Sequence, residues 1–154
     1  MISDLDRYHG IVLRQILVAH GGVLRVGVIE TSGQVDAYSL EGVAFVVKRS
    51  SKRLSPWRFT FLRENLGQLV ELERSFPHVW IFLVCGGDGV VGLSLSELRT
   101  ISTAGRGRSA WVRVSRNRNS MYRVGGALGE LGRAKPRGVE AFLAAVFERT
   151  LKRV

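Results

Sequence analysis

Two runs of this chain, VAFVVK at 43–48 and HVWIFLVC at 78–85, are too apolar to leave either side of a strand in water. Successive apolar positions are typical of a strand that is covered on both faces. We therefore expect two buried strands, with 43–48 in the middle of a sheet. Between them, leucines recur at helical intervals over 61–76 until Pro77 ends the pattern, which predicts a helix.

Weaker patterns predict the remaining elements. These are a helix over 4–20, strands over 23–30 and 35–40 joined by a turn at Ser32–Gly33, a strand over 90–95, a short helix capped by Ser94 or Ser96, a loop over 103–109, a β-hairpin over 111–124 and a helix over 139–151. No internal repeat or long linker divides the chain. We therefore expect one domain over residues 1–154, of α/β or α+β class, with a mixed central sheet flanked by helices.

The composition is that of a globular protein, with 45% apolar and 23% charged residues. The single cysteine, Cys85, lies in the most apolar run, so we expect a buried thiol rather than a disulfide or a catalytic nucleophile. No apolar run approaches the ~18 residues of a membrane span. The pattern predicts a cytoplasmic protein that does not bind membranes.

The charge is unusual, because 23 Lys and Arg residues outweigh 13 Asp and Glu residues and give a net charge of +10. The cations are concentrated in two acid-free segments, 48–63 and 99–129. Clustered cations attract polyanions through charge and counterion release. We therefore expect nucleic acid as the partner, DNA more than RNA. The candidate contact residues are Lys48, Arg49, Lys52, Arg53, Arg58, Arg113, Arg116, Arg118 and Arg123.

The proposed hairpin places Arg116, Asn117, Arg118 and Asn119 at its tip. A two-stranded ribbon can enter a major groove, where Arg and Asn can contact phosphates or base edges. The turn that follows 43–48 could lie near the same anion. The alternative is two independent solvated loops, and the sequence does not show whether the two segments converge.

The order of helix, hairpin, third strand bearing Lys48, helix and strand, over about residues 4–85, resembles the core of the PD-(D/E)XK nuclease-like superfamily. The resemblance implies a restriction-endonuclease-like core and Mg²⁺ held by acidic residues on adjacent strands. It also implies catalytic roles for Asp36 and Lys48. The motif is incomplete, because Val46 stands where the second acid belongs. Glu30 is the nearby acid that could compensate.

A second resemblance covers about residues 43–125. The segments VKRSSKRLSPWRFTF, IFLVCGGDGVVGLSLSEL and WVRVSRNRNSMYRV are similar to small, poorly characterised bacterial proteins with KYSSKR-S-PWRF-type segments. This resemblance implies no settled activity.

Purely structural roles compete with these functional ones. Asp36 can be a solvated residue at a strand edge, Lys48 can extend from a strand end, and the alternating Trp57, Phe59 and Phe61 can pack in the core. The histidines and Cys85 lack the spacing of a metal site, and the Gly-rich turn at 86–89 lacks a P-loop lysine.

Three hypotheses follow. The first is a nucleic-acid-binding protein with a nuclease-like core and degenerate or absent catalysis, needing no cofactor. The second is a divergent Mg²⁺-dependent nuclease that uses Asp36, Lys48 and Glu30. The third is an adaptor for an acidic protein partner. A homodimer is compatible with all three.

Overall fold

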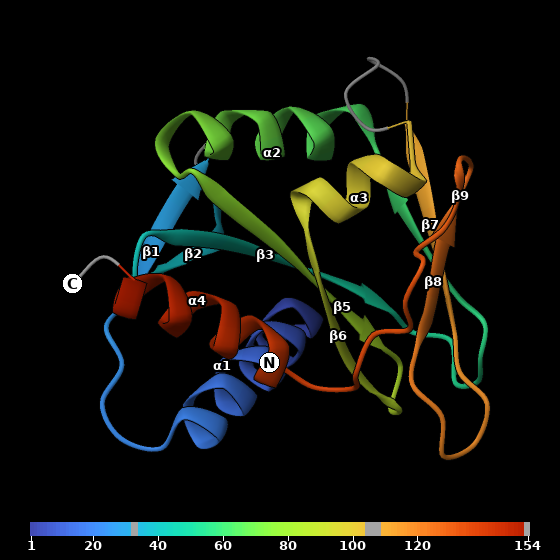
Figure 1. Ribbon diagram of the computed structural model, residues 1–154, viewed down its shortest axis with the longest axis horizontal. Coiled ribbons are helices and arrows are strands. Elements are labelled where there is room, and N and C mark those ends of the chain that lie inside the picture. The colour runs from blue at the N-terminus through green and yellow to red at the C-terminus, as the bar shows by residue number, and fades with distance from the viewer. Residues whose placement is uncertain (32–33, 104–108, 153–154) are drawn as a thin grey trace.

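The computed structural model describes residues 1–31, 34–103 and 109–152, and it shows four helices and two β-sheets (Figure 1). The helices are α1 (Asp4–His20), α2 (Arg63–Ser75), α3 (Leu95–Ile101) and α4 (Glu140–Lys152). The strands are β1 (Val26–Thr31), β2 (Gln34–Leu40), β3 (Val43–Ser50), β4 (Trp57–Phe61), β5 (His78–Cys85), β6 (Gly89–Ser94), β7 (Ala110–Ser115), β8 (Arg123–Gly126) and β9 (Gly129–Glu130). The expected mixed α/β class is confirmed.

The main sheet has five strands in the order β1-β2-β3-β5-β6. Strands β1, β2 and β3 form an antiparallel meander, and β5 lies parallel to β3 with Val46 opposite Ile81. A parallel neighbour needs a crossover, which is provided by the segment containing α2. Strand β3 is the middle strand, as its two apolar faces predict.

The second sheet has the order β4-β7-β8-β9, and its strands pair antiparallel. In β4 the aromatic residues Trp57, Phe59 and Phe61 are buried, while Arg58 and Thr60 are exposed. The core role predicted for these aromatic side chains is therefore confirmed. Because side chains alternate along a strand, the sheet has one face in the core and one in solvent.

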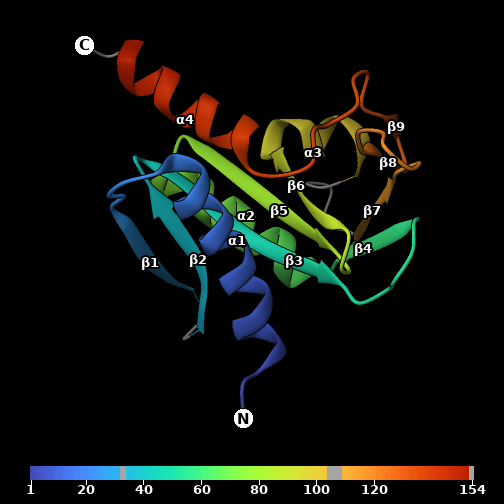
Figure 2. The same ribbon diagram turned by 90° about the horizontal axis from the view of Figure 1, so that it is seen from below.

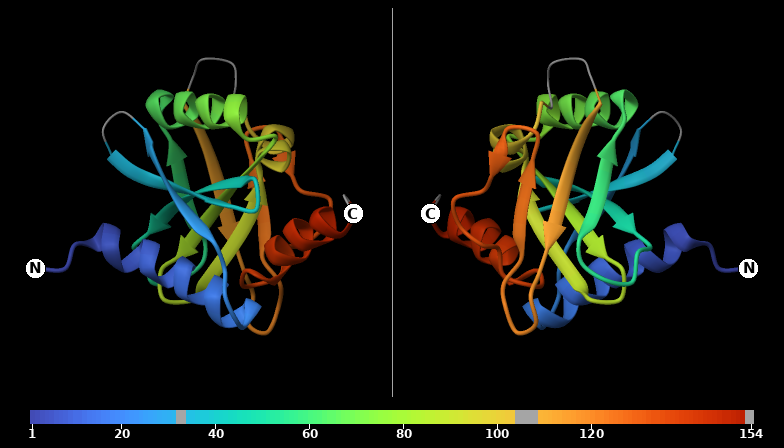
Figure 3. Two further views of the ribbon diagram at one scale, coloured as in Figure 1. Left: turned by 90° about the vertical axis from the view of Figure 1, so that its left-hand side faces the viewer. Right: turned by 90° about the vertical axis from the view of Figure 1, so that its right-hand side faces the viewer.

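Helices and strands cover both faces of the main sheet (Figures 2 and 3). On one face, α2, α3 and the inner side of the second sheet enclose a core that includes Leu69, Ile81 and Val112. On the other face, α1 and α4 enclose a second core around Phe45 and Phe142. The two cores share the strands of the main sheet, so the molecule is one compact domain.

Several predicted boundaries differ from the structure. Strand β1 begins at Val26 rather than Val23, because Val26 pairs with Leu40, the last residue of its partner strand. The helix expected from residue 61 begins at Arg63, because Phe61 belongs to β4. The C-terminal helix begins at Glu140, just after the buried Val139.

Two predicted features lie outside the described residues. They are the turn at Ser32–Gly33 and most of the loop over 103–109, with Arg106 and Arg108. None of the helices in the described part of the chain combines the length and the apolar character needed to cross a membrane.

Candidate functional site

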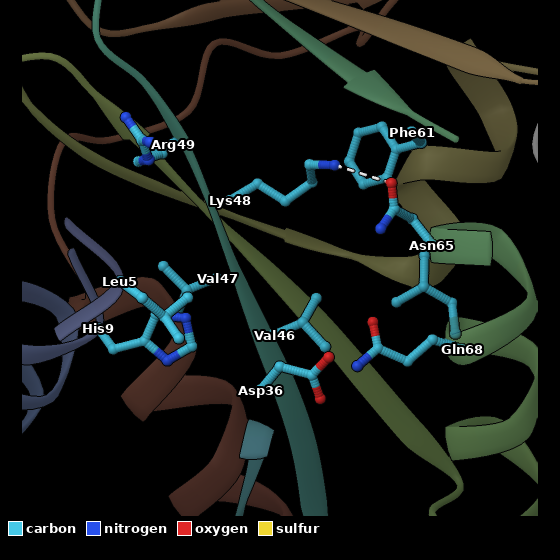
Figure 4. Close-up of a pocket in the computed structure, with 11 residues that line it drawn as sticks. Leu5, His9, Asp36, Val46, Val47, Lys48, Arg49, Phe61, Asn65 and Gln68 are labelled. Atoms are coloured by element: carbon cyan, nitrogen blue, oxygen red, sulfur yellow. Dashed lines mark hydrogen bonds between the residues drawn. The ribbon is translucent and has the colours of Figure 1, made fainter. Parts of the chain in front are cut away.

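Asp36 and Lys48 line the same pocket, a cavity of about 250 Å³ between α1, the β2–β3 pair and α2 (Figure 4). Strands β2 and β3 are neighbours with Ala37 opposite Val46, and Asp36 lies where β2 is irregular, because Ile29 pairs with Ala37 and Glu30 with Val35. The two residues that the nuclease resemblance singles out are therefore neighbours in space. Their functional groups, however, take different directions.

The Lys48 side chain reaches toward the start of α2. Its Nζ donates to the carbonyl oxygen of Thr60 at 2.6 Å and to Oδ1 of Asn65 at 3.1 Å. It also lies 4.8 Å from the centre of the Phe61 ring. Burial lowers the pKa of the Lys48 ammonium.

The Asp36 carboxylate points instead toward the side-chain amide of Gln68 (Figure 4). It also lies close enough to His9 to influence the pKa of that imidazole. The structure thus brings Asp36 and Lys48 into one pocket without directing the ammonium at the carboxylate.

The residues of this pocket do not fit the Mg²⁺ site that the resemblance implies. Val46 packs in the core with 5% of its surface exposed and supplies no ligand. Among the described residues that line the pocket, Asp36 alone carries a carboxylate. Glu30 is exposed on β1 and is not one of those lining residues. The described chain also contains no group of three His, Cys, Asp or Glu side chains that could hold a metal ion.

Arg49 lies on the opposite side of β3 from Lys48, near the start of α1. Its guanidinium is 3.5 Å from the Asp4 carboxylate and 4.9 Å from the centre of the Tyr8 ring. Both partners are contributed by α1, so Arg49 helps to hold this helix beside β3.

The β3–β4 loop and the β7–β8 loop meet, whereas Lys48 and Arg49 of the first basic segment are held at α2 and α1. The β3–β4 loop packs against the base of the β7–β8 hairpin, where the backbone N–H of Arg116 donates to Oγ of Ser55 at 3.0 Å. Trp57 Nε1 anchors the same loop by donating to the Lys52 carbonyl at 2.8 Å. Lys52 and Arg53 in the first loop and Arg118 in the second are exposed.

Arg116 itself has a structural partner. Its Nε and Nη2 donate to the two carboxylate oxygens of Asp88 at 2.8 and 2.6 Å, and the Tyr122 hydroxyl donates to the same carboxylate at 2.6 Å. The hydrogen bonds from Arg116 are the main cause that lowers the pKa of Asp88. Because its fork of donors is occupied, Arg116 is poorly placed to contact a phosphate or a base.

Three other predicted contact residues share one surface, the solvent-exposed side of the second sheet. This arginine face consists of Arg58 on β4, Arg113 and Trp111 on β7, and Arg123 on β8. Arg58 lies directly opposite Arg113 across the β4–β7 pair. The Arg58 guanidinium lies 4.8 Å from the centre of the Trp111 ring.

Like charges that face each other across neighbouring strands repel and destabilise the pair. Within the described residues, neither Arg58 nor Arg113 has an acidic side chain within 4.0 Å, whereas Arg123 has Glu130 at that distance. An anion bound between Arg58 and Arg113 would relieve their repulsion. Within the described residues, the arginine face therefore carries positive charge that no nearby carboxylate balances at Arg58 and Arg113.

Trp111 was not among the candidate binding residues predicted from the sequence. The signal for it is the alternation in AWVRVS, which places Trp111 on the same side of the strand as Arg113. Trp111 can contact a ligand only if its side of β7 faces solvent. The packing of the second sheet decides which side that is, and the sequence alone does not show it.

Comparison with known proteins finds no family, no curated protein and no solved structure that matches this chain. Its function is therefore inferred from the arginine face, the converging basic loops and the pocket beside Lys48.

Proposed function

We propose that this protein binds nucleic acid, and does not cleave it, through the arginine face and the adjoining basic loops. The observation that carries the proposal is the cross-strand pair of Arg58 and Arg113, exposed and without an acidic partner among the described residues, beside the aromatic ring of Trp111. Guanidinium groups bind phosphate through two parallel hydrogen bonds, and an aromatic ring among them offers a surface for a base.

The positions of the cations support a repeating polyanion as the ligand. Side chains on one face of a strand recur at steps of two residues, about 6.6 Å. Arg123 lies opposite Ser115, one such step from the Arg58–Arg113 pair and toward the hairpin tip. Exposed Lys52, Arg53 and Arg118 continue the positive surface beyond the sheet. A nucleic-acid backbone supplies phosphates along such a path, whereas an acidic protein needs no regular spacing.

The main sheet supports the second part of the proposal, a nuclease-like core with degenerate catalysis. Helix α1, the β1–β2–β3 meander, the crossover through α2 and the parallel strand β5 follow the order that the resemblance describes. The pocket shared by Asp36 and Lys48 favours the nuclease alternative. The methyl groups of Val46, where the second carboxylate would stand, argue against it.

The test is a salt titration of binding with two matched double variants. Arg58→Gln/Arg113→Gln removes the pair, and Arg14→Gln/Arg74→Gln removes two exposed arginines from α1 and α2. Both variants have the same net charge. On duplex DNA each phosphate contact contributes about 0.9 to the slope of log affinity against log salt, so we expect the first variant to lose up to about 1.8.

The control variant should keep nearly the wild-type slope. Equal losses in the two variants would show that net charge alone drives binding, and an unchanged affinity in the first variant would overturn the proposal. Binding that survives excess DNA and heparin competitors would instead favour an acidic protein as the partner.

A further inference from the structure

The arginine face contains a hollow of about 300 Å³ with a floor of bare backbone. Gly125, Gly126 and Trp111 line this hollow. Gly125 lies opposite Arg113 on the exposed side of the sheet, and a Cβ there would meet the Glu130 side chain. Gly126 lies opposite the buried Val112, so it adds only backbone to the hollow. Because neither glycine has a side chain, a flat group can approach the strand.

The rim of the hollow carries both signs of charge. Arg113 and Arg123 supply guanidinium groups, and Glu130 supplies the one carboxylate among the described residues that line it. Arg123 Nη1 lies 4.0 Å from a Glu130 carboxylate oxygen, which links the two side chains across β8 and β9. An apolar ring, two phosphate-binding groups and one hydrogen-bond acceptor thus surround a hollow of small-molecule size.

We propose that this hollow holds one unpaired base of a single-stranded nucleic acid, stacked on Trp111, with the flanking phosphates at Arg113 and Arg123. The inference rests on the proposed nucleic-acid-binding function and names its ligand class. Bases within a duplex are already stacked on their neighbours and cannot offer a ring face to Trp111, so the hollow selects single strands.

Glu130 gives the hollow a preference among bases. Guanine presents two adjacent donors on its Watson–Crick edge, N1–H and the N2 amino group, and these match the two oxygens of a carboxylate. Adenine and cytosine present one amino group there. Thymine and uracil present an imino N–H flanked by two carbonyl oxygens, which a carboxylate repels. The stacked base is therefore guanine in preference to thymine.

The first test uses the fluorescence of Trp111. The chain has three tryptophans, and Trp57 and Trp80 are buried with 2% and 6% of their surfaces exposed. Stacking of a base on Trp111 should quench the exposed fraction of the emission when a single-stranded oligonucleotide of roughly 12 nucleotides is added, a length within the usual range for one binding site. A duplex of the same sequence should quench it much less.

Trp111→Leu should weaken single-strand binding by roughly 10- to 100-fold, the usual effect of losing one stacked base, and should weaken duplex binding much less. Trp111→Phe keeps an aromatic ring and should retain most of the affinity. Unfolding midpoints of both variants show whether the sheet is intact, and quenching in the wild-type protein tests the stacking without any variant.

The base preference is tested with thymidine oligonucleotides that carry one central guanine, adenine or cytosine. The guanine oligonucleotide should bind most tightly, and Glu130→Ala should remove the difference from thymine. Equal affinities for all four oligonucleotides in the wild-type protein would refute the role of Glu130.

The outcomes separate this inference from the function on which it rests. If Trp111→Leu binds single strands as tightly as the wild-type protein while Arg58→Gln/Arg113→Gln binds weakly, the stacking site is wrong and the nucleic-acid interface stands. If neither variant loses affinity, both proposals fail. Tighter binding to duplex than to single strand, without quenching, would also overturn the stacking site.

Discussion

Lys48 extends from the central strand of the main sheet to the start of α2, where the Asn65 side chain accepts two hydrogen bonds. Asn65 Oδ1 accepts from Lys48 Nζ at 3.1 Å and from the backbone N–H of Leu62 at 2.9 Å. Asn65 thus accepts the Leu62 N–H at the start of the helix that connects the two parallel strands, and Lys48 holds the Asn65 side chain in place. This structural role accounts for its position without any catalysis.

The Cys85 thiol lies at the end of β5 with none of its surface exposed, which confirms the burial predicted from the apolar run. Burial is the main cause that raises the pKa of this thiol to about 12, and the charge of Asp88 adds to the effect. A thiol with such a pKa stays protonated near neutrality and is a poor nucleophile.

His9 provides a pH-dependent contribution to stability. Its imidazole is 6% exposed, and Nδ1 lies 2.7 Å from the Tyr38 hydroxyl. Burial lowers the pKa of His9, and the opposing charges of Asp36 and Asp6 have smaller effects. The unfolded chain keeps the ordinary value of about 6.5 and so binds the proton more readily. We expect the free energy of unfolding to fall as the pH drops below about 6.5 and to keep falling until the lower folded pKa is passed.

His9→Asn removes the titrating ring and retains a hydrogen-bond acceptor for Tyr38. It should flatten the dependence of unfolding free energy on pH between about 5 and 7, where one histidine contributes at most about 1.4 kcal/mol per pH unit. Denaturant titrations across this range measure the slope. His20→Asn, in a histidine stacked on Phe147, serves as the control. A slope that persists in His9→Asn would assign the acid sensitivity to other groups.

At the scale of elements, the β5–β6 turn fastens the β7–β8 hairpin to the main sheet through Asp88. Its carboxylate accepts hydrogen bonds from Arg116 and Tyr122, and its backbone carbonyl accepts one from Arg137 at 3.4 Å. These donors come from the two ends of the β7–β8 loop and from the segment before α4. One side chain thus connects parts of the chain that are far apart in sequence.

Asp88→Asn should lower the midpoint of thermal unfolding by several degrees, because it removes the charge that Arg116 pairs with. Tyr122→Phe removes a single hydrogen bond and should lower the free energy of unfolding by about 1 kcal/mol, less than Asp88→Asn does.

The pKa of Asp88 is lowered in the folded state. The stability that this carboxylate contributes is therefore present above the ordinary carboxyl pKa and is lost as the pH falls through the folded value. Nucleic-acid affinity should not change in Asp88→Asn at temperatures where it is folded. A large loss of affinity there would place Arg116 in the interface.

The helices and strands were easier to predict from the sequence than the pairing of one strand with another. The apolar runs at 43–48 and 78–85 identify β3 and β5, because a strand covered on both faces leaves a continuous pattern. The alternation in WRFTF identifies which residues of β4 are buried. It does not identify β7, some fifty residues later, as the partner of β4, because alternation specifies a face and not a neighbour.

The same limit applies to the candidate sites. Arg58, Arg113 and Arg123 were selected from the sequence for their charge, but their common face follows from the pairing of β4, β7 and β8. The pairing of Arg116 with Asp88 is also a tertiary contact between turns 28 residues apart. Asp36 and Lys48 line one pocket, while the directions of their side chains depend on Asn65 and Gln68 from α2.

At the scale of the whole molecule, β4 joins the two candidate regions. Its Phe61 ring lines the pocket beside Lys48, while its Arg58 lies on the arginine face. The pocket lacks the second carboxylate that the nuclease pattern requires, and Arg58 and Arg113 have no acidic partner among the described residues. The proposed function therefore leads to a prediction about the wild-type chain.

We expect the wild-type protein to bind DNA and to leave plasmid DNA uncut in the presence of Mg²⁺ or Mn²⁺. Catalysis of this type needs divalent ions to stabilise charge on the phosphate, and their ligands are carboxylates and water. Asp36 provides one carboxylate, Val46 provides none, and the Lys48 ammonium is engaged by Thr60 and Asn65. A plasmid nicking assay with Asp36→Ala as its control measures this. Metal-dependent cutting that disappears in Asp36→Ala would show that the pocket recruits a ligand from elsewhere, and it would make this protein a nuclease whose arginine face holds the substrate.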